Sequence, residues 1–431
     1  MSKELIVGLD IGTTKVCAIV GQRNENGKIN ILGVGSKPSM GGVMRGEVTN
    51  VARTVEAIKG AIAEASKVSN VEIANVLVGI AGEHIRSFQQ SGVRIRHYAE
   101  VEISKAELQE MNKEQFRTAI DPGSQILHAF PQEYIIDSKQ VTTAPEGMMG
   151  SKLECKYHII TGRMNAAKTI VKCVEDAGLT AADVVVEPIA SAFAVLSEEE
   201  LQTGIAIVDI GGGTTDLAIF YGGKIRHTAV IPFGGEIITQ DIVEAFGILP
   251  KQAELIKVKY GHALPEGTRS NVIITVPGIG DRKPKQILEK NLAHVINARM
   301  KEILGLVNDE IKISSYKDKL NLGVVLTGGG AQLKDISNLA EFVLSCEAKI
   351  GMPDPHLGTG LVDEVKSPMF ATCIGLVLKG CSDLEPISAE NHMRPDGKKQ
   401  KSANGGSVFK NLYVNFKDWM KDDKAMGDYE R

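Results

Sequence analysis

At 431 residues, the chain exceeds the roughly 250–300 residues at which a single core usually stops growing, so two or more domains are expected. The net charge of −4 argues against a nucleic-acid-binding protein, which would normally carry a basic face. Six scattered cysteines without a C-x-x-C pair argue against a zinc site and a disulfide framework, and they fit a reducing cytosol. The N-terminus lacks the features of a signal peptide, and no run approaches the roughly 18 apolar residues of a transmembrane helix.

Residues 1–82 have the pattern of an α/β domain. Apolar strands are predicted in ELIVGLD, TKVCAIVG and KINILGV, separated by turns at GT and ENG. A helix is predicted from about Asn50, a suitable N-cap, to Lys67. One side of this helix collects its apolar residues, which are Val51, Val55, Ile58, Ile62 and Ala65. A further buried strand, NVLVGIAG, follows.

Residues 83–162 differ from what precedes them. Alternating patterns in SFQQSGVRIRHY and LHAFPQEYIIDS surround one polar helix near 104–118, which predicts an inserted α+β subdomain. The first domain is predicted to resume over 163–200. It continues with a helix at Asn165–Ala177, a strand at Asp183–Glu187 and a helix at Pro188–Leu201 that has proline at its first position.

The opening pattern recurs after Gly204. GLDIGTTKVCAIV and IVDIGGGTTDLAIF share an apolar strand, an aspartate, a Gly-Thr turn and a second apolar strand. Such a duplication implies two like domains that face each other across a cleft. The second domain is predicted at 201–381, with a smaller subdomain at about 237–321 and helices from Gly235 onward.

The two Gly-Thr turns predict a phosphate-binding site. Glycines let backbone N–H groups approach phosphate oxygens, threonine hydroxyls add donors, and an aspartate at the strand end suits Mg²⁺ with its waters. Plain hairpin turns are the alternative, which the repetition of the motif disfavours. The predicted metal residues, through water, are Asp10 and Asp209. The predicted phosphate residues are Gly12, Thr13, Thr14, Lys15, Gly211, Gly212, Gly213, Thr214, Thr215, Gly234 and Gly235.

A third glycine cluster, VVLTGGGAQL at Val324–Leu333, follows a strand and is predicted to open a helix. Gly328, Gly329 and Gly330 would let a ligand approach the backbone at a helix N-terminus. A tight strand-to-helix turn without a ligand is the alternative. Beside the two phosphate turns, this cluster is better interpreted as a loop on the adenosine side of a nucleotide.

These motifs resemble those of the actin, Hsp70 and sugar-kinase superfamily. Its five signatures correspond to Gly8–Lys15, Glu187–Leu196, Val208–Asp216, Leu326–Leu333 and Pro368–Leu378. Within it, the chain resembles the FtsA family of bacterial cell-division proteins. The matching segments, in order, include LHAFPQEYIIDS, EPIASAFAVL, VDIGGGTTDLAIF, GGEIITQDI, LTGGGAQL and SPMFATCIGLVLKG. The resemblance implies duplicated RNase H-like domains of the actin type around a nucleotide cleft, with ATP and Mg²⁺ bound between them.

The last segments suggest a membrane anchor. Residues 382–406 read as a flexible linker, and 407–423 as an amphipathic helix. Seven apolar residues, four of them aromatic, fall within an arc of about 140°, and charged residues occupy most of the remainder. The predicted membrane-contacting residues are Phe409, Leu412, Phe416, Trp419 and Met420. Docking of this helix on a protein surface is the alternative.

By resemblance, the chain is expected to polymerise on the cytoplasmic face of the membrane at the division site and to tether FtsZ filaments there. It would bind the FtsZ C-terminal tail with its second domain and contact other division proteins. A sugar-type kinase and a pilus-assembly adaptor of the same fold are the rivals, and an Hsp70-like ATPase would need a further C-terminal domain. Glu187 is the candidate catalytic residue, either orienting a water or simply starting a helix packed between the domains, and at most slow ATP hydrolysis is expected.

Overall fold

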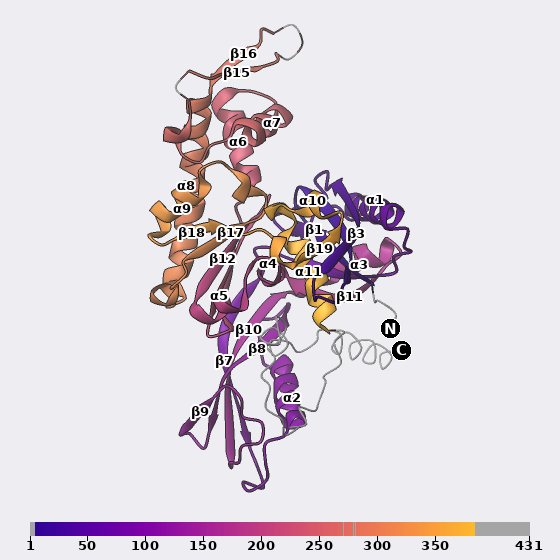
Figure 1. Cartoon of the computed structure of the whole chain (residues 1–431), viewed down its shortest axis with the longest axis vertical. Helices are drawn as coiled ribbons and strands as arrows, with labels where there is room; N and C mark the ends of the chain where they lie inside the picture. Colours follow the sequence, from indigo (N-terminus) through magenta and orange to yellow (C-terminus); the bar gives the residue numbers. More distant parts are fainter. Residues whose placement is uncertain (1–4, 270, 279, 281, 384–431) are drawn as a thin grey trace.

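The computed structural model describes residues 5–269, 271–278, 280 and 282–383. The described part is elongated, with the first domain on the right, the second domain on the left and extending upward, and the insert below (Figure 1). The first two residues of the predicted linker, 382 and 383, are described and belong to the last described helix. The rest of the linker and the predicted amphipathic helix, which holds Phe409, Leu412, Phe416, Trp419 and Met420, lie outside the described residues. No helix in the described part is both long enough and apolar enough to span a membrane.

The first domain is built on a six-stranded sheet of order β11-β6-β1-β2-β3-β19. Strands β1 (Leu5–Ile11), β2 (Lys15–Arg23) and β3 (Ile29–Pro38) form an antiparallel meander. Strands β6 (Asn75–Ile80), β11 (Thr180–Val186) and β19 (Leu357–Gly360) extend it in parallel. Almost every residue of β1 and of the first two thirds of β2 is buried, as expected of strands covered on both faces.

Helix α1 (Val51–Ser69) begins as predicted, because the Asn50 side chain accepts a hydrogen bond from the backbone N–H of Arg53 at 3.1 Å. Its predicted apolar side is partly wrong, since Val51 is exposed and Ala57 and Ala61 are buried instead. The cause is a close helix–strand contact: a Cβ at Gly35 of β3 would lie 2.0 Å from the carbonyl oxygen of Ala61. Small residues therefore occupy the centre of the contact.

The second domain repeats the topology of the first. Its sheet has the order β14-β13-β12-β17-β18, which matches β3-β2-β1-β6-β11 in both sequence and strand direction. The strands are β12 (Ile205–Ile210), β13 (Thr215–Tyr221), β14 (Lys224–Ile231), β17 (Val324–Thr327) and β18 (Ala348–Ile350). The duplication predicted from the two motifs is therefore confirmed at the level of the fold.

Helices and one hairpin build out from the second sheet (Figure 1). They are α6 (Gly235–Phe246), α7 (Pro250–Tyr260), the hairpin of β15 (Ile273–Val276) and β16 (Lys285–Leu288), α8 (Glu289–Ile313) and α9 (Ile336–Leu344). Helix α8 packs against both α6 and α9. Its buried residues recur at helical spacing and join the apolar core of the second domain.

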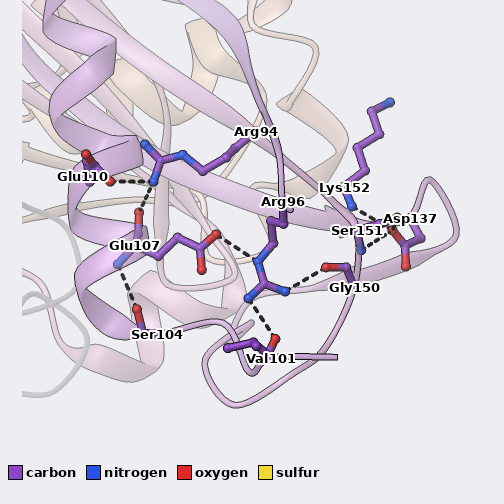
Figure 2. Close-up of polar contacts among 10 residues, drawn as sticks. All are labelled: Arg94, Arg96, Val101, Ser104, Glu107, Glu110, Asp137, Gly150, Ser151 and Lys152. Carbon is purple, nitrogen blue, oxygen red and sulfur yellow. Dashed lines mark hydrogen bonds and ion pairs between the residues drawn. The ribbon is translucent and has the colours of Figure 1, made fainter. Parts of the chain in front are cut away.

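The insert has an apolar core of its own beneath a four-stranded sheet of order β7-β10-β8-β9. Its elements are β7 (Arg86–Ile95), α2 (Lys105–Glu114), β8 (Ser124–Ile136), β9 (Gln140–Thr142) and β10 (Lys152–Arg163). Figure 2 shows how the edge strand is fastened to α2: Arg94 binds Glu110, while Arg96 binds Glu107 and two backbone carbonyls. The loop after β8 is closed by Asp137, which accepts hydrogen bonds from Ser151 and Lys152 (Figure 2).

Two of the predicted helices differ in the structure. The single helix expected at Pro188–Leu201 is divided into α4 (Glu187–Val195) and α5 (Glu198–Thr203), because Ser197 and Glu200 form a capping box that starts a new helix. Pro188 is accordingly the second residue of α4. The cluster Gly328–Gly330 leads into a short 3₁₀ turn, and α9 begins only at Ile336.

The remaining elements complete the first domain. Helix α3 (Met164–Asp176) and the small pair β4 (Val43–Met44) and β5 (Glu47–Val48) lie near α1, and α10 (Val362–Val365) follows β19. Helix α11 (Ala371–Asp383), drawn in yellow in Figure 1, packs on β1, β2 and α4. Its buried residues complete the apolar core of the first domain, although they come from near the end of the described chain.

Candidate functional site

The two predicted phosphate loops form the same turn. In the first, the Gly12 N–H donates to the Lys15 carbonyl at 3.0 Å, and in the second, the Gly211 N–H donates to the Thr214 carbonyl at 2.9 Å. Each loop joins the first two strands of its sheet directly after the aspartate. The duplicated sequence motif is thus a duplicated backbone structure.

Each loop is supported by the segment that follows the third strand of its domain. Ser39 donates its hydroxyl to the Gly12 carbonyl at 2.6 Å in the first domain. In the second, the backbone N–H groups of Gly235 and Glu236 donate to the carbonyls of Gly211 and Gly212 at 2.9 and 2.8 Å. With their carbonyls occupied in this way, the loops are fixed before any ligand binds.

The loops meet across the cleft with almost no space between them. A Cβ at Gly212 would lie 2.4 Å from the Thr14 methyl carbon, and a Cβ at Gly213 would lie 2.4 Å from the Thr13 hydroxyl oxygen. Because these glycines have no side chain, the backbone of the second loop lies directly against the side chains of Thr13 and Thr14 in the first loop. The resulting pocket is lined by Asp10, Ile11, Gly12, Thr13, Thr14, Lys15, Gly46, Ala81, Glu187, Asp209, Gly211, Gly212, Gly213, Thr214, Asp216, Gly328, Gly329, Pro368, Met369 and Thr372.

The third glycine loop closes one side of this pocket. Gly328 has φ +82°, and a Cβ there would lie 2.2 Å from Asp209 Oδ1, so no other residue fits without displacement. Its N–H donates to the Pro368 carbonyl at 3.2 Å. Lys15 reaches the same segment, donating from Nζ to the Met369 carbonyl at 3.1 Å.

Four carboxyl groups gather at the base of the pocket. Burial raises the pKa of Asp10 to about 6, with the charge of Lys15 opposing the shift and that of Asp209 adding to it. Burial beside Asp209 raises the pKa of Asp216 to about 8. Burial and the three aspartates raise the pKa of Glu187 well above its usual value. Burial also raises the pKa of Asp209, although two hydroxyl donors oppose the shift. Such a concentration of negative charge is the setting that a divalent cation stabilises.

Most of the predicted site residues come together in this pocket, and four do not line it. Thr215 is fully buried and donates to the Phe233 carbonyl at 2.8 Å. Gly234 and Gly235 support the second loop from behind, and Gly330 packs against Ile210. These four residues therefore lie outside the pocket lining, and the contact with Ile210 could not be foreseen from the local sequence.

The sequence reasoning missed several residues of the pocket. Asp216 could have been found, because strand register places it opposite Asp209 at the position that Cys17 occupies opposite Asp10. Gly46, Ala81 and Thr372 come from segments with no phosphate-binding pattern. Lys257, behind the second loop, was also missed. Its Nζ donates to the Gly235 carbonyl at 2.7 Å.

Comparison with known proteins gives a family for this architecture. A family model described as cell division protein FtsA matches residues 206–375, and one described as an SHS2 domain inserted in FtsA matches residues 82–161. FtsA of Pseudomonas aeruginosa is 40% identical over 380 residues, which cover 88% of this chain and 90% of that protein. The chain belongs to the FtsA family of cell-division proteins.

Another FtsA protein agrees with this assignment, and solved structures share the fold. FtsA of Escherichia coli K12 is 36% identical over 419 residues, which cover 95% of this chain and 97% of that protein. A PilM–PilN type IV pilus biogenesis complex has a TM-score of 0.64 at 18% identity, covering 88% of this chain and 99% of that chain. Spiroplasma citri MreB5 bound to AMPPNP has a TM-score of 0.52 at 15% identity, covering 89% of this chain and 99% of that chain. At such identities these structures show the actin-like fold alone, and the FtsA matches disfavour the kinase and pilus-adaptor alternatives.

Proposed function

We propose that this FtsA-family chain binds ATP with Mg²⁺ in the cleft, polymerises on the cytoplasmic face of the membrane at the division site, and tethers FtsZ filaments there. The observation that carries the nucleotide part is the meeting of two identical Gly-Thr turns above buried carboxylates. Structures of MreB5, which shares the fold, contain ADP and AMPPNP. The same cleft is the proposed nucleotide site here.

The residues of the pocket fit a nucleotide with its cation. The Gly12 and Gly211 turns expose backbone to the pocket, and the glycines at 212 and 213 let the two loops come together around it. Asp216 Oδ1 is buried without a hydrogen-bond partner, which is the kind of atom that a water of a hydrated cation satisfies. A bound Mg²⁺ would neutralise phosphate charge.

The proposed division of roles follows from position. Asp10 and Asp209 would hold the cation through water, while Thr13, Thr14 and Lys15 would bind phosphate from the first domain. In the described residues, no three His, Cys, Asp or Glu side chains converge closely enough to ligate one metal directly. Glu187 lies at the start of α4 and lines the pocket, where it could orient a water for slow hydrolysis.

The FtsZ C-terminal tail is proposed to bind the smaller subdomain of the second domain. Helix α7 of this subdomain exposes Leu255 and Val258, which are 65% and 75% exposed and lie three residues apart on one side of the helix. Replacing both by aspartate should abolish binding of a labelled FtsZ-tail peptide, measured by fluorescence anisotropy. Retained binding would move the tail site to another surface.

Membrane attachment is tested by vesicle co-sedimentation with ATP and Mg²⁺. The full-length chain should pellet with vesicles. A chain ending at Lys401 and a full-length Phe416→Glu/Trp419→Glu variant should stay in the supernatant. Both changes remove apolar side chains whose burial in the membrane would contribute roughly 0.8 kcal/mol per CH₂ group. Pelleting of the double variant would place the anchor elsewhere. If the unmodified chain does not pellet, the terminal helix is a docking element.

A further inference from the structure

Asp209, at the end of β12, is held from one side by two hydroxyl groups. Ser191 Oγ, on α4, donates to Asp209 Oδ2 at 2.5 Å, and Thr372 Oγ1, on α11, donates to the same oxygen at 3.1 Å. The two hydroxyl oxygens lie 3.0 Å apart, and all three side chains are buried. One carboxylate oxygen of the second domain is thus fixed by the two helices that run between the domains.

The two helices cross at a point next to these donors. A Cβ at Gly375 of α11 would lie 1.7 Å from the carbonyl oxygen of Ala190 on α4, so the helices touch backbone to backbone. Ala190 directly precedes Ser191, and Gly375 lies about one turn after Thr372. Because no side chain separates the helices at the contact, the spacing of the two hydroxyls at Asp209 depends on how α4 and α11 pack here.

The other oxygen of the carboxylate faces the pocket. Asp209 Oδ1 lies beside Gly328 of the third loop, where a Cβ would approach it to 2.2 Å. The carboxylate therefore has one oxygen held at the helix crossing and the other beside Gly328, which lines the pocket. Serine and threonine inside helices commonly donate to a carbonyl three or four residues earlier, whereas Ser191 and Thr372 donate to an aspartate of another element.

We infer that Ser191 and Thr372 are positioning residues that form an interdomain latch on Asp209. The latch orients Oδ1 for the cation of the bound nucleotide only when α4 and α11 cross as they do in this structure. It thereby links the angle between the domains to the strength of cation-dependent nucleotide binding. This inference rests on the proposed role of Asp209 in holding Mg²⁺ through water.

The test compares ATP affinity in Mg²⁺ with ATP affinity in EDTA, using full-length protein and titration calorimetry. Ser191→Ala/Thr372→Val should reduce the Mg²⁺-dependent gain in affinity by about tenfold, the range seen when partners that orient metal-binding groups are removed. Affinity in EDTA should stay within about twofold of the unmodified chain. A purely structural role for the hydroxyls would instead weaken both affinities together.

Matched controls separate the latch from general damage. Ser66→Ala/Thr228→Val also removes one serine and one threonine hydroxyl that are hydrogen-bonded and at least partly buried, but far from the pocket, and it should leave the Mg²⁺-dependent gain unchanged. If the double variant fails to fold, Ser191→Ala alone serves as the weaker perturbation. Thr372→Ser keeps the hydroxyl and should retain most of the gain.

The outcomes are distinct. An unmodified chain that shows no Mg²⁺-dependent ATP binding refutes the proposed function and the latch with it. An unmodified chain that binds ATP with Mg²⁺, together with a double variant whose gain is unchanged, refutes the latch alone.

Discussion

Gly213→Ala gives a direct test of the contact between the two phosphate loops. The backbone of Gly213 does not have positive φ, so alanine adds no local strain. Its new methyl group would lie 2.4 Å from Thr13 Oγ1 and 2.9 Å from the backbone nitrogen of Arg45, where ordinary contacts begin at 3.4 Å. Thr13 can rotate away, but the Arg45 backbone cannot. The loops therefore have to separate by about 0.5–1 Å in the closed cleft.

The expected cost is that of overpacking a close contact, about 1–3 kcal/mol, which corresponds to about 5–150-fold weaker ATP binding. Isothermal titration calorimetry with ATP and Mg²⁺ measures this loss, and urea unfolding without nucleotide should show almost no change. Gly305→Ala is the control, because nothing lies within 4 Å of a Cβ there. It should stabilise α8 by about 0.5–1 kcal/mol without altering ATP affinity. Unchanged ATP binding by Gly213→Ala would refute the idea that the loops approach this closely around nucleotide.

Three further predictions concern other parts of the fold. Burial, together with the nearby His227 and Arg226, lowers the pKa of His158 to about 3. The unfolded chain therefore takes up the proton more readily, and the stability due to the neutral ring is lost as pH falls from about 6.5 towards 3. The unfolding free energy of the unmodified chain minus that of His158→Gln should fall by about 1.4 kcal/mol per pH unit between pH 6 and 4, and a flat difference in urea titrations would contradict this. Gly375→Ala should destabilise the chain by about 3 kcal/mol or more in urea unfolding, because its methyl group overlaps a backbone carbonyl, and a loss below about 1 kcal/mol would show that the helices can separate cheaply. Lys15→Met should weaken ATP binding at least about tenfold by calorimetry while leaving thermal unfolding without nucleotide nearly unchanged, and equal affinity would exclude Lys15 from the phosphate site.

The sequence allows the fold to be predicted where it contains a local capping pattern or a repeated motif. Asn50 caps α1 because an asparagine side chain satisfies a free N–H, and the repeated Asp-Gly-Thr pattern indicates two like sheets. The break at Ser197 could also have been predicted, since Glu200 completes a capping box. The clustering of Asp10, Asp209 and the glycines follows from the same repetition.

What the sequence does not carry are contacts between distant segments. Ser191 and Thr372 meet at Asp209 only because α4 and α11 cross, and the crossing depends on a glycine that resembles many others in the chain. Val51 was predicted on the buried side of α1 but is exposed, and the close approach of Gly35 to Ala61 and Ala65 places alanines at the centre of the contact. Tertiary packing, which no local pattern reports, decided both outcomes.

Helix α11 runs from the nucleotide pocket to the end of the described chain. Thr372 lies at its beginning, and its 13 residues extend about 20 Å to Asp383, inside the segment predicted to link the second domain to the membrane helix. A rigid helix can pass a displacement from either end to the other, and thermodynamic linkage makes the coupling between events at its two ends reciprocal. If nucleotide binding shifts the far end of α11, then a pull exerted from the proposed membrane helix must change nucleotide affinity by the same free energy. With the proposed anchor, such a protein would register mechanical load at the membrane as a change in its bound-nucleotide state.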